Sequence, residues 1–250
     1  MSNTSTATQR FNAVTLRTSG YPFWGSNRAE YCGHPSFWLD CSNNDPLINI
    51  TYMNYRVLEI NNSPRTLRVA RSDYLDTICP PTIVNTTIDF NLFSYSTTNA
   101  TNLTLYYNCQ PSASATAAAI FTPFLSIITP LVCEINNTNS VNYYMNSTIQ
   151  NLIGIGLGIC SYRVKVPVLA AAAQTAELAV TQAEVITAIN GGFMLEWIAN
   201  NPQCDECVGA GGLCGSDPTT KAFACHCING TFTSGCSGAV STGKHPICCH

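Results

Sequence analysis

Charged side chains are scarce in this sequence. Lysine and arginine together number 11 and aspartate and glutamate 14 among 250 residues, for a net charge of −3. A surface with so few charges must be solvated by hydroxyls, amides or attached glycans, and serine, threonine and asparagine are plentiful. The negative balance argues against a polyanionic partner, and we expect no nucleic acid, which binds mainly to lysine and arginine.

Long apolar stretches are also missing. The longest one, 117–132, is shorter than the roughly 20 residues of a membrane-spanning helix, and Pro123 and Pro130 interrupt it. The first 20 residues are polar and contain no apolar core of a signal peptide. We therefore expect 1–20 to be an unstructured lead in part of a longer sequence, with any membrane anchor outside this chain.

The motifs of common enzyme classes do not occur. Kinase signatures are absent, as is the G-x-S-x-G motif of serine hydrolases, and the four histidines have no H-x-x-x-H spacing. The glycine-rich segment 154–158 lacks the context of a nucleotide loop and is interpreted as a flexible loop. We predict a protein with no active site, no metal and no cofactor. A carbohydrate-active hydrolase is an alternative that would need two facing carboxylates.

Cysteine, in contrast, is abundant, with 14 residues. An even number with a dense C-terminal cluster is typical of a disulfide framework, which persists in an oxidising compartment. Six predicted disulfide cysteines precede the cluster, without predicted partners: Cys32, Cys41, Cys79, Cys109, Cys133 and Cys160. Cys248 and Cys249 in the C-terminal tail have no predicted partner either.

Acceptor triplets for N-glycosylation also indicate secretion. One of nine lies in the lead, at Asn3. The other eight are predicted glycosylation sites: Asn49, Asn61, Asn85, Asn99, Asn102, Asn136, Asn146 and Asn229. With the cysteines, they predict an extracellular glycoprotein.

Alternating apolar residues predict short strands in the first part of the chain. Ile48, Ile50 and Tyr52 share one face, and 87–93 and 102–109 alternate in the same way. The triplets at Asn49 and Asn102 fall on the polar face. This pattern predicts an antiparallel sheet with one solvated side.

A second β-rich unit follows a predicted linker at 110–125. Val164, Val166 and Val168 alternate with cations, and Phe193, Leu195 and Trp197 alternate with Met194 and an outward Glu196. Between them, 170–190 is alanine-rich and ends at two glycines, which predicts one helix. The predicted fold is mainly β, with two small disulfide-rich antiparallel units, one short helix and a C-terminal cysteine module.

The cysteine cluster has the spacing C-x2-C-x6-C-x10-C-x-C-x8-C and resembles an EGF-like module. That resemblance implies the pairs Cys204–Cys214, Cys207–Cys225 and Cys227–Cys236. So short a segment cannot bury a core and needs such cross-links. Zinc is the competing interpretation, because the first two cysteines have the spacing of a ligand pair.

Several ordered motifs resemble a known family of plant receptors. The block YPFWG at 21–25, followed by YCGHPSFWLDC at 31–41 and LTLYYNC at 103–109, is similar to the galacturonan-binding domain of wall-associated and leaf-rust-resistance-like receptor kinases. GFMLEW at 192–197 and the cysteine cluster resemble the C-terminal domain of wall-associated kinases. The resemblance implies a galacturonan-binding domain at 21–110, a C-terminal domain whose β part is 111–203 and whose EGF-like module is 204–236, and a tail at 237–250.

The chain departs from the family pattern at two points. Family members usually carry a pair of cysteines shortly before the YPFWG block, and 1–20 contain none. If that pair bonds with Cys32 or Cys41, the first domain here lacks one cross-link. The family pattern also continues into a membrane helix and a kinase, which this chain does not include.

The resemblance implies binding to pectic polygalacturonate, a polyanion that needs cations for its carboxylates and aromatic faces for its sugars. Residues 1–71 carry seven arginines against four carboxylates, a net charge of +3 that leaves −6 for the remainder. Candidate contacts are Arg28, Arg56, Arg65, Arg68 and Arg71, with Tyr21, Trp24 and Trp38 as stacking surfaces. The alternatives are aromatics in the core, arginines on solvated strand edges, and Asp73 pairing with Arg71. A peptide-binding module would instead show an exposed apolar patch.

Overall fold

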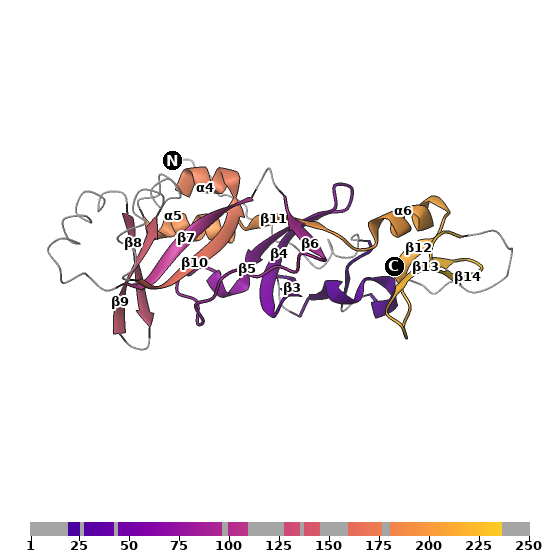
Figure 1. Cartoon of the computed structure of the whole chain (residues 1–250), viewed down its shortest axis with the longest axis horizontal. Coiled ribbons are helices and arrows are strands. Elements are labelled where there is room, and N and C mark those ends of the chain that lie inside the picture. Colours follow the sequence, from indigo (N-terminus) through magenta and orange to yellow (C-terminus); the bar gives the residue numbers. More distant parts are fainter. Residues whose placement is uncertain are drawn as a thin grey trace, which may run out of the picture. The chain divides into compact units, whose positions relative to one another are not determined.

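A computed structural model describes residues 20–25, 28–42, 45–96, 100–109, 128–135, 138–145, 160–176 and 181–236. Within these ranges the protein is mainly β, as predicted, and contains several sheets and three α-helices (Figure 1). The predicted lead (except residue 20), linker, glycine-rich loop and tail lie outside them, as do the acceptors Asn99, Asn136 and Asn146. None of the helices in the described part has the length and hydropathy of a membrane span.

The chain forms two compact units, each assembled from separate segments. Unit 1 consists of Met1–Asn49, Arg56–Arg65 and Trp197–His250, and unit 2 consists of Ile50–Tyr55 and Thr66–Glu196. Strand β4 (Met53–Asn61) contributes residues to both units. The predicted boundary at residue 110 lies outside the described residues and stays a prediction, as do the other boundaries.

The first part of unit 1 is a small sheet with the strand order β1-β2-β3-β4. Strand β1 (Trp24–Gly25) pairs in parallel with β2 (Trp38–Asp40), which pairs antiparallel with β3 (Leu47–Ile50). Two short 3-10 helices, η1 (Glu30–Cys32) and η2 (Pro35–Phe37), connect β1 to β2. The buried rings of Phe37 and Trp197 pack edge-on against Phe23, with centroids 5.6 and 5.0 Å away.

The second part of unit 1 is the cysteine module. Helix α6 (Asn201–Gly209) precedes three antiparallel strands, β12 (Leu213–Ser216), β13 (Phe223–Cys227) and β14 (Gly230–Phe232). The disulfides are Cys204–Cys214, Cys207–Cys225 and Cys227–Cys236, which confirms the predicted pairing. Zinc ligation requires thiolates, so the oxidised sulfurs of this module do not form the alternative metal site.

Unit 2 contains a four-stranded antiparallel sheet in the order β10-β7-β9-β8 (Figure 1). Its strands are β7 (Ala100–Cys109), β8 (Ile128–Ile135), β9 (Thr138–Met145) and β10 (Cys160–Leu169). Helices α4 (Ala170–Ala176) and α5 (Gln182–Asn190) pack against β7 and β10. Leu105, Tyr144 and Val164 share the buried core with Ala173 of α4 and Val185 of α5.

The remaining strands of unit 2 follow the order β4-β5-β11-β6. Strand β5 (Thr66–Arg71) pairs antiparallel with β11 (Phe193–Trp197), and β6 (Phe93–Tyr95) completes the order. A 3-10 helix, η3 (Ser72–Tyr74), follows β5 directly. Phe193 and Leu195 are buried and Glu196 is exposed, as the alternation predicted.

The helix prediction was right in place and wrong in number. Residues 170–190 contain two helices, and α6 is a third that was not predicted. Helix α5 begins at a capping box, because Thr181 Oγ1 accepts the N–H of Glu184 and the Glu184 carboxylate accepts the N–H of Thr181. It ends at the predicted glycine pair, where Gly192 adopts a φ of +69°.

Two strand predictions were wrong. Residues 87–92 are not a strand, and β6 begins only at Phe93. The side chain of Asp89 accepts the N–H of Asn91 and its backbone carbonyl accepts the N–H of Phe93, which closes a turn. Tyr52 does not face the core with Ile48 and Ile50. Thr51 and Tyr52 form the turn between β3 and β4 with φ of +50° and +66°, which leaves Tyr52 99% exposed.

The predicted solvated face of β7 is only partly solvated. Asn102 and Asn108 are exposed, but Thr104 and Tyr106 between them are buried. Strand β7 lies inside its sheet, with β10 and β9 on either side. The predicted exposure of the acceptors Asn49 and Asn102 is confirmed.

The disulfide prediction was wrong for Cys41. Unit 2 contains Cys79–Cys133 and Cys109–Cys160, and Cys32 is also disulfide-bonded. Cys41 is a free thiol. Every other cysteine in the described part of the chain is already oxidised, so no described thiol is left as its partner.

Candidate functional site

Two tryptophans lie side by side on the sheet of unit 1. Trp24 of β1 is directly opposite Trp38 of β2, and their ring centroids are 6.5 Å apart at an interplanar angle of 52°. The indole N–H of Trp24 donates to the carbonyl oxygen of His34 at 2.8 Å. Trp38 is 45% exposed. We call Trp24 and Trp38 the tryptophan pair.

Glycine and histidine in the connecting segment fix the position of Trp24. A Cβ atom on Gly33 would lie 2.6 Å from the Trp24 ring and 2.8 Å from the Pro22 carbonyl oxygen, so only glycine fits there. Nδ1 of His34 accepts the backbone N–H of Ser36 at 3.2 Å and caps η2. The motif YCGHPSFW therefore folds into a short, closely packed connection that holds one indole next to the other.

Burial lowers the pKa of His34 below its ordinary value of about 6.5. The folded state thus favours the neutral ring, which fits its role as an acceptor for Ser36. The stability that this neutral form contributes is complete above the unfolded pKa and is lost as pH falls through the folded pKa.

Unit 1 should therefore lose more stability on acidification than a variant that cannot titrate at this position. We expect the free energy of unfolding of the wild type, measured with urea, to fall between pH 7.5 and pH 5 by more than that of His34→Asn. The asparagine keeps a capping acceptor but does not titrate. Tryptophan fluorescence measures the unfolding directly, because Trp24, Trp38 and Trp197 all belong to unit 1. An equal loss in both proteins would remove His34 from the pH response.

Three of the five candidate arginines belong to unit 1. Arg28 lies next to the tryptophan pair, because its backbone N–H donates to the Gly25 carbonyl at 2.9 Å. Arg56 forms an ion pair with Asp45 at 3.8 Å. Arg65 forms an ion pair and hydrogen bond with Asp205.

The other two candidate arginines belong to unit 2. Arg68 is half-buried, and its guanidinium donates to the carbonyl of Gly191 at 3.5 Å. Arg71 is 1% exposed, and its guanidinium donates to both carboxylate oxygens of Asp73, at 3.0 and 2.6 Å. The alternative interpretation, in which Asp73 pairs with Arg71, is confirmed. A buried and fully engaged guanidinium cannot reach a polymer, so the structure contradicts Arg71 as a ligand contact.

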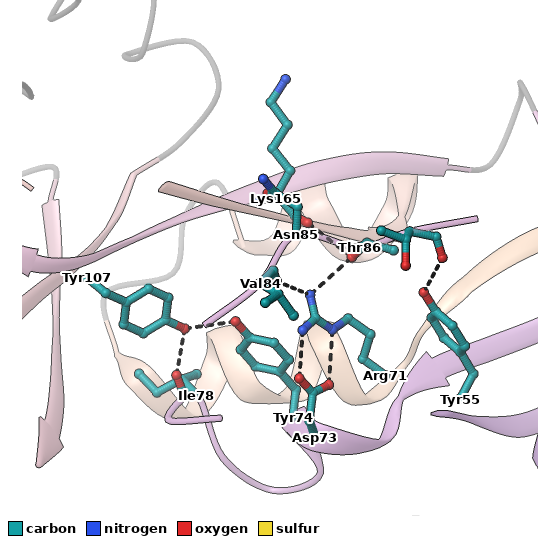
Figure 2. Close-up of polar contacts among 11 residues, drawn as sticks. Tyr55, Arg71, Asp73, Tyr74, Ile78, Val84, Asn85, Thr86, Tyr107 and Lys165 are labelled. Carbon is teal, nitrogen blue, oxygen red and sulfur yellow. Dashed lines mark hydrogen bonds and ion pairs between the residues drawn. The ribbon is translucent and has the colours of Figure 1, made fainter. Parts of the chain in front are cut away.

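Figure 2 shows what Arg71 does instead. Its Nη1 donates to the Val84 carbonyl at 2.9 Å and to the Thr86 hydroxyl at 3.3 Å. Its guanidinium carbon also lies 4.6 Å from the centroid of the Tyr74 ring. Arg71 thus fastens the irregular segment after η3 to the end of β5.

The third candidate aromatic, Tyr21, is half-buried against the cysteine module. Its ring meets Phe223 edge-on with centroids 5.9 Å apart. Burial raises the pKa of its hydroxyl far above the ordinary value. The ring of Tyr21 therefore packs against other residues of unit 1 and offers little exposed surface for stacking on a sugar.

Carboxylates are present near the tryptophan pair but not as a buried couple. Asp40 lies on β2 two residues after Trp38, on the same face, and hydrogen bonds from the hydroxyl and N–H of Ser42 hold its pKa below the usual range. Of the aspartate and glutamate side chains that the structure describes, none is buried. The described residues thus give no observation that favours the hydrolase alternative.

Comparison with known proteins gives two family matches. Residues 17–71 match the galacturonan-binding family of wall-associated receptor kinases, and residues 132–230 match the wall-associated receptor kinase C-terminal family. The chain belongs to the ectodomain family of wall-associated and leaf-rust-resistance-like receptor kinases. The tryptophan pair and Arg28 all lie inside the galacturonan-binding match.

Curated relatives from Arabidopsis thaliana agree with this assignment. The chain is 30% identical over 232 residues to leaf rust 10 disease-resistance locus receptor-like protein kinase-like 2.8, covering 89% of this chain and 24% of the relative. It is 30% identical over 212 residues to receptor-like protein kinase-like 2.1 of the same series, covering 83% of this chain and 31% of the relative. The chain thus spans about a quarter to a third of these relatives. No solved structure matches it significantly.

Sequence reasoning found both tryptophans but not their arrangement. The motifs gave Trp24 and Trp38 as separate candidates, while the parallel pairing of β1 with β2 brings them together. A two-residue strand that pairs in parallel across two 3-10 turns has no periodic signal in the sequence. The ion pair of Arg65 with Asp205 was unpredictable for a similar reason, since 140 positions separate the two residues.

Proposed function

We propose that this chain is the polysaccharide-binding ectodomain of a receptor-kinase-like protein at the cell-wall face of the plasma membrane. Its proposed ligand is pectic polygalacturonate. The observation that carries the proposal is the tryptophan pair, which lies within the segment that matches the galacturonan-binding family.

The tryptophan pair suits a sugar ring in physical terms. An exposed indole offers a flat apolar face to the C–H groups of a pyranose, and Trp38 is the exposed member. The hydrogen bond of Trp24 to His34 holds the second ring in place, which lowers the entropy cost of binding. Arg28 supplies a cation beside the pair.

Asp40 limits how an acidic ligand can lie on this surface. Its carboxylate shares a face with Trp38, so the carboxylate of a bound galacturonate must point away from it. The side of Trp24, next to Arg28, provides that direction. Electrostatics would thus orient the ligand, while stacking would supply most of the affinity.

Peptide binding is the second candidate, and two exposed aromatics of unit 2 favour it. Tyr52 is 99% exposed and Phe90 is 67% exposed. The hydroxyl of Thr87, near Phe90, donates to the carbonyl of Thr51 at 3.5 Å, which holds the turn against this segment. Exposed aromatics of this kind are common at protein interfaces.

Two matched aromatic substitutions in the full chain test whether the tryptophan pair binds polygalacturonate. Trp38→Ala should weaken binding to polygalacturonate about tenfold or more, as expected for an aromatic anchor. Tyr52→Ala should leave that binding unchanged. Isothermal titration calorimetry with polygalacturonate of defined length measures both, and circular dichroism verifies folding. If Trp38→Ala bound as tightly as wild type, the tryptophan pair would not be the site.

A further inference from the structure

A second group of aromatic and cationic side chains lies on the four-stranded sheet of unit 2. Four residues directly opposite one another cross the four-stranded sheet: Arg163 of β10, Tyr106 of β7, Tyr143 of β9 and Pro130 of β8. Directly opposite residues project from the same face of a sheet. We call these four residues the outer row.

The outer row faces away from the helices. The next position along each strand brings Val164, Leu105 and Tyr144 together, and all three are buried in the core that includes residues of α4 and α5. Because successive side chains of a strand alternate between faces, the outer row occupies the opposite side of the sheet. Arg163 and Pro130 are exposed there, Tyr143 is half-buried and Tyr106 is buried between them.

The cations of this face are held in defined positions. The guanidinium carbon of Arg163 lies 5.7 Å from the centroid of the Tyr106 ring, within the range of a cation–π contact. Lys165 is exposed two residues further along β10, so it shares the face of Arg163 at a spacing of about 7 Å. The ammonium of Lys165 forms no ion pair with a carboxylate in the described part of the chain.

The backbone at Lys165 is fixed by the segment that Arg71 fastens. The N–H of Lys165 donates to Oδ1 of Asn85 at 2.9 Å, and its carbonyl accepts the hydroxyl of Thr86 at 3.1 Å. Thr86 in turn accepts a hydrogen bond from Arg71. In Figure 2 the side chain of Lys165 extends away from this network. The backbone N–H and carbonyl of Lys165 on β10 are thus both hydrogen-bonded, while the side chain of Lys165 points away from these partners.

We propose that the outer row, together with Lys165, is a second binding site for a carboxylated polysaccharide, distinct from the tryptophan pair of unit 1. The two cations suit the carboxylates, and the ring and proline surfaces of Tyr143 and Pro130 suit the apolar faces of the sugars. An acidic peptide would satisfy the cations but would gain less from the surfaces of Tyr143 and Pro130. This inference rests on the proposed function in one respect, which is the choice of polygalacturonate as the first probe.

The test compares two double variants of the full chain, each of which removes two positive charges. Arg163→Gln with Lys165→Gln should weaken binding to polygalacturonate about fivefold or more and flatten its salt dependence, since exposed charge contacts are screened by salt. Lys221→Gln with Lys244→Gln should retain the affinity of wild type. The N-glycans are trimmed enzymatically first, because the predicted acceptors Asn85 and Asn102 border this face.

Four further results separate this inference from the proposed function. If Trp38→Ala lost all binding and the Arg163/Lys165 variant lost none, the outer row would not be a site. If wild type failed on polygalacturonate but bound alginate, another uronate polymer, through Arg163 and Lys165, the inference would stand and the proposed function would fall. Equal, Arg163-dependent binding of polyglutamate would identify an acidic peptide ligand and overturn the polysaccharide assignment, and failure on every polymer would overturn both proposals.

Discussion

Replacing Arg71 by methionine should destabilise unit 2 by about 3–5 kcal/mol, the usual cost of removing one partner from a buried ion pair. The side chain of Arg71 is fully buried and donates four hydrogen bonds. Its loss would leave the Asp73 carboxylate, which is 24% exposed, without its cation. It would also leave the carbonyl of Val84 without its donor. Both losses destabilise the segment whose Asn85 and Thr86 form hydrogen bonds with the backbone of Lys165 on β10.

Two companion variants show whether the forked geometry of the guanidinium is responsible. Arg71→Lys keeps the charge but cannot make two parallel bonds to Asp73, so it should recover only part of the loss. Arg71→Met with Asp73→Asn removes the unpaired charge and should be more stable than Arg71→Met alone. Urea unfolding followed by far-ultraviolet circular dichroism gives the free energies, and tryptophan fluorescence serves as the control for unit 1. A loss below about 1 kcal/mol for Arg71→Met would contradict the assigned role.

Arg71 also shows where sequence reasoning reached its limit. Residues 1–71 carry a net positive charge, and the resemblance to a galacturonan-binding domain made the arginines candidate contacts. A count of charges cannot distinguish a solvated arginine from one that pairs with a carboxylate. Arg56, Arg65 and Arg71 all form such pairs, two of them with residues close in sequence and one with a residue far away.

Local chemistry was more predictable than tertiary arrangement. The disulfides of the cysteine module were implied by the resemblance to an EGF-like module, and the structure has the same pairs. The burial of Val164 and Leu195 followed from alternation, since one face of each strand meets a core. The turn at Tyr52 could not be read the same way, because its residues continue the alternating pattern of β3 and only the positive φ reverses the chain.

Removing the Cys79–Cys133 disulfide should cost unit 2 about 4 kcal/mol. The bond closes a loop of 54 residues, and the chain-entropy estimate for a loop of that length is about 4 kcal/mol at room temperature. Cys79 follows Ile78, whose carbonyl accepts the buried hydroxyl of Tyr107 at 2.7 Å. The cross-link thus joins β8 to the start of the segment that Arg71 fastens, and its loss should loosen this segment first.

The Cys109–Cys160 disulfide provides the matched comparison, because its loop of 51 residues is nearly the same length. Loop entropy acts on the unfolded chain, so the paired alanine substitutions at either disulfide should cost the same within about 0.5 kcal/mol. All variants should carry Cys41→Ala, which removes the free thiol that could exchange with the remaining disulfides. Hydrogen exchange read on peptides from 72–96 then reports the segment directly. A much larger cost for Cys79–Cys133 would mean that the bond acts mainly on the folded state, because two cross-links with equal loops would then differ only in what they hold together.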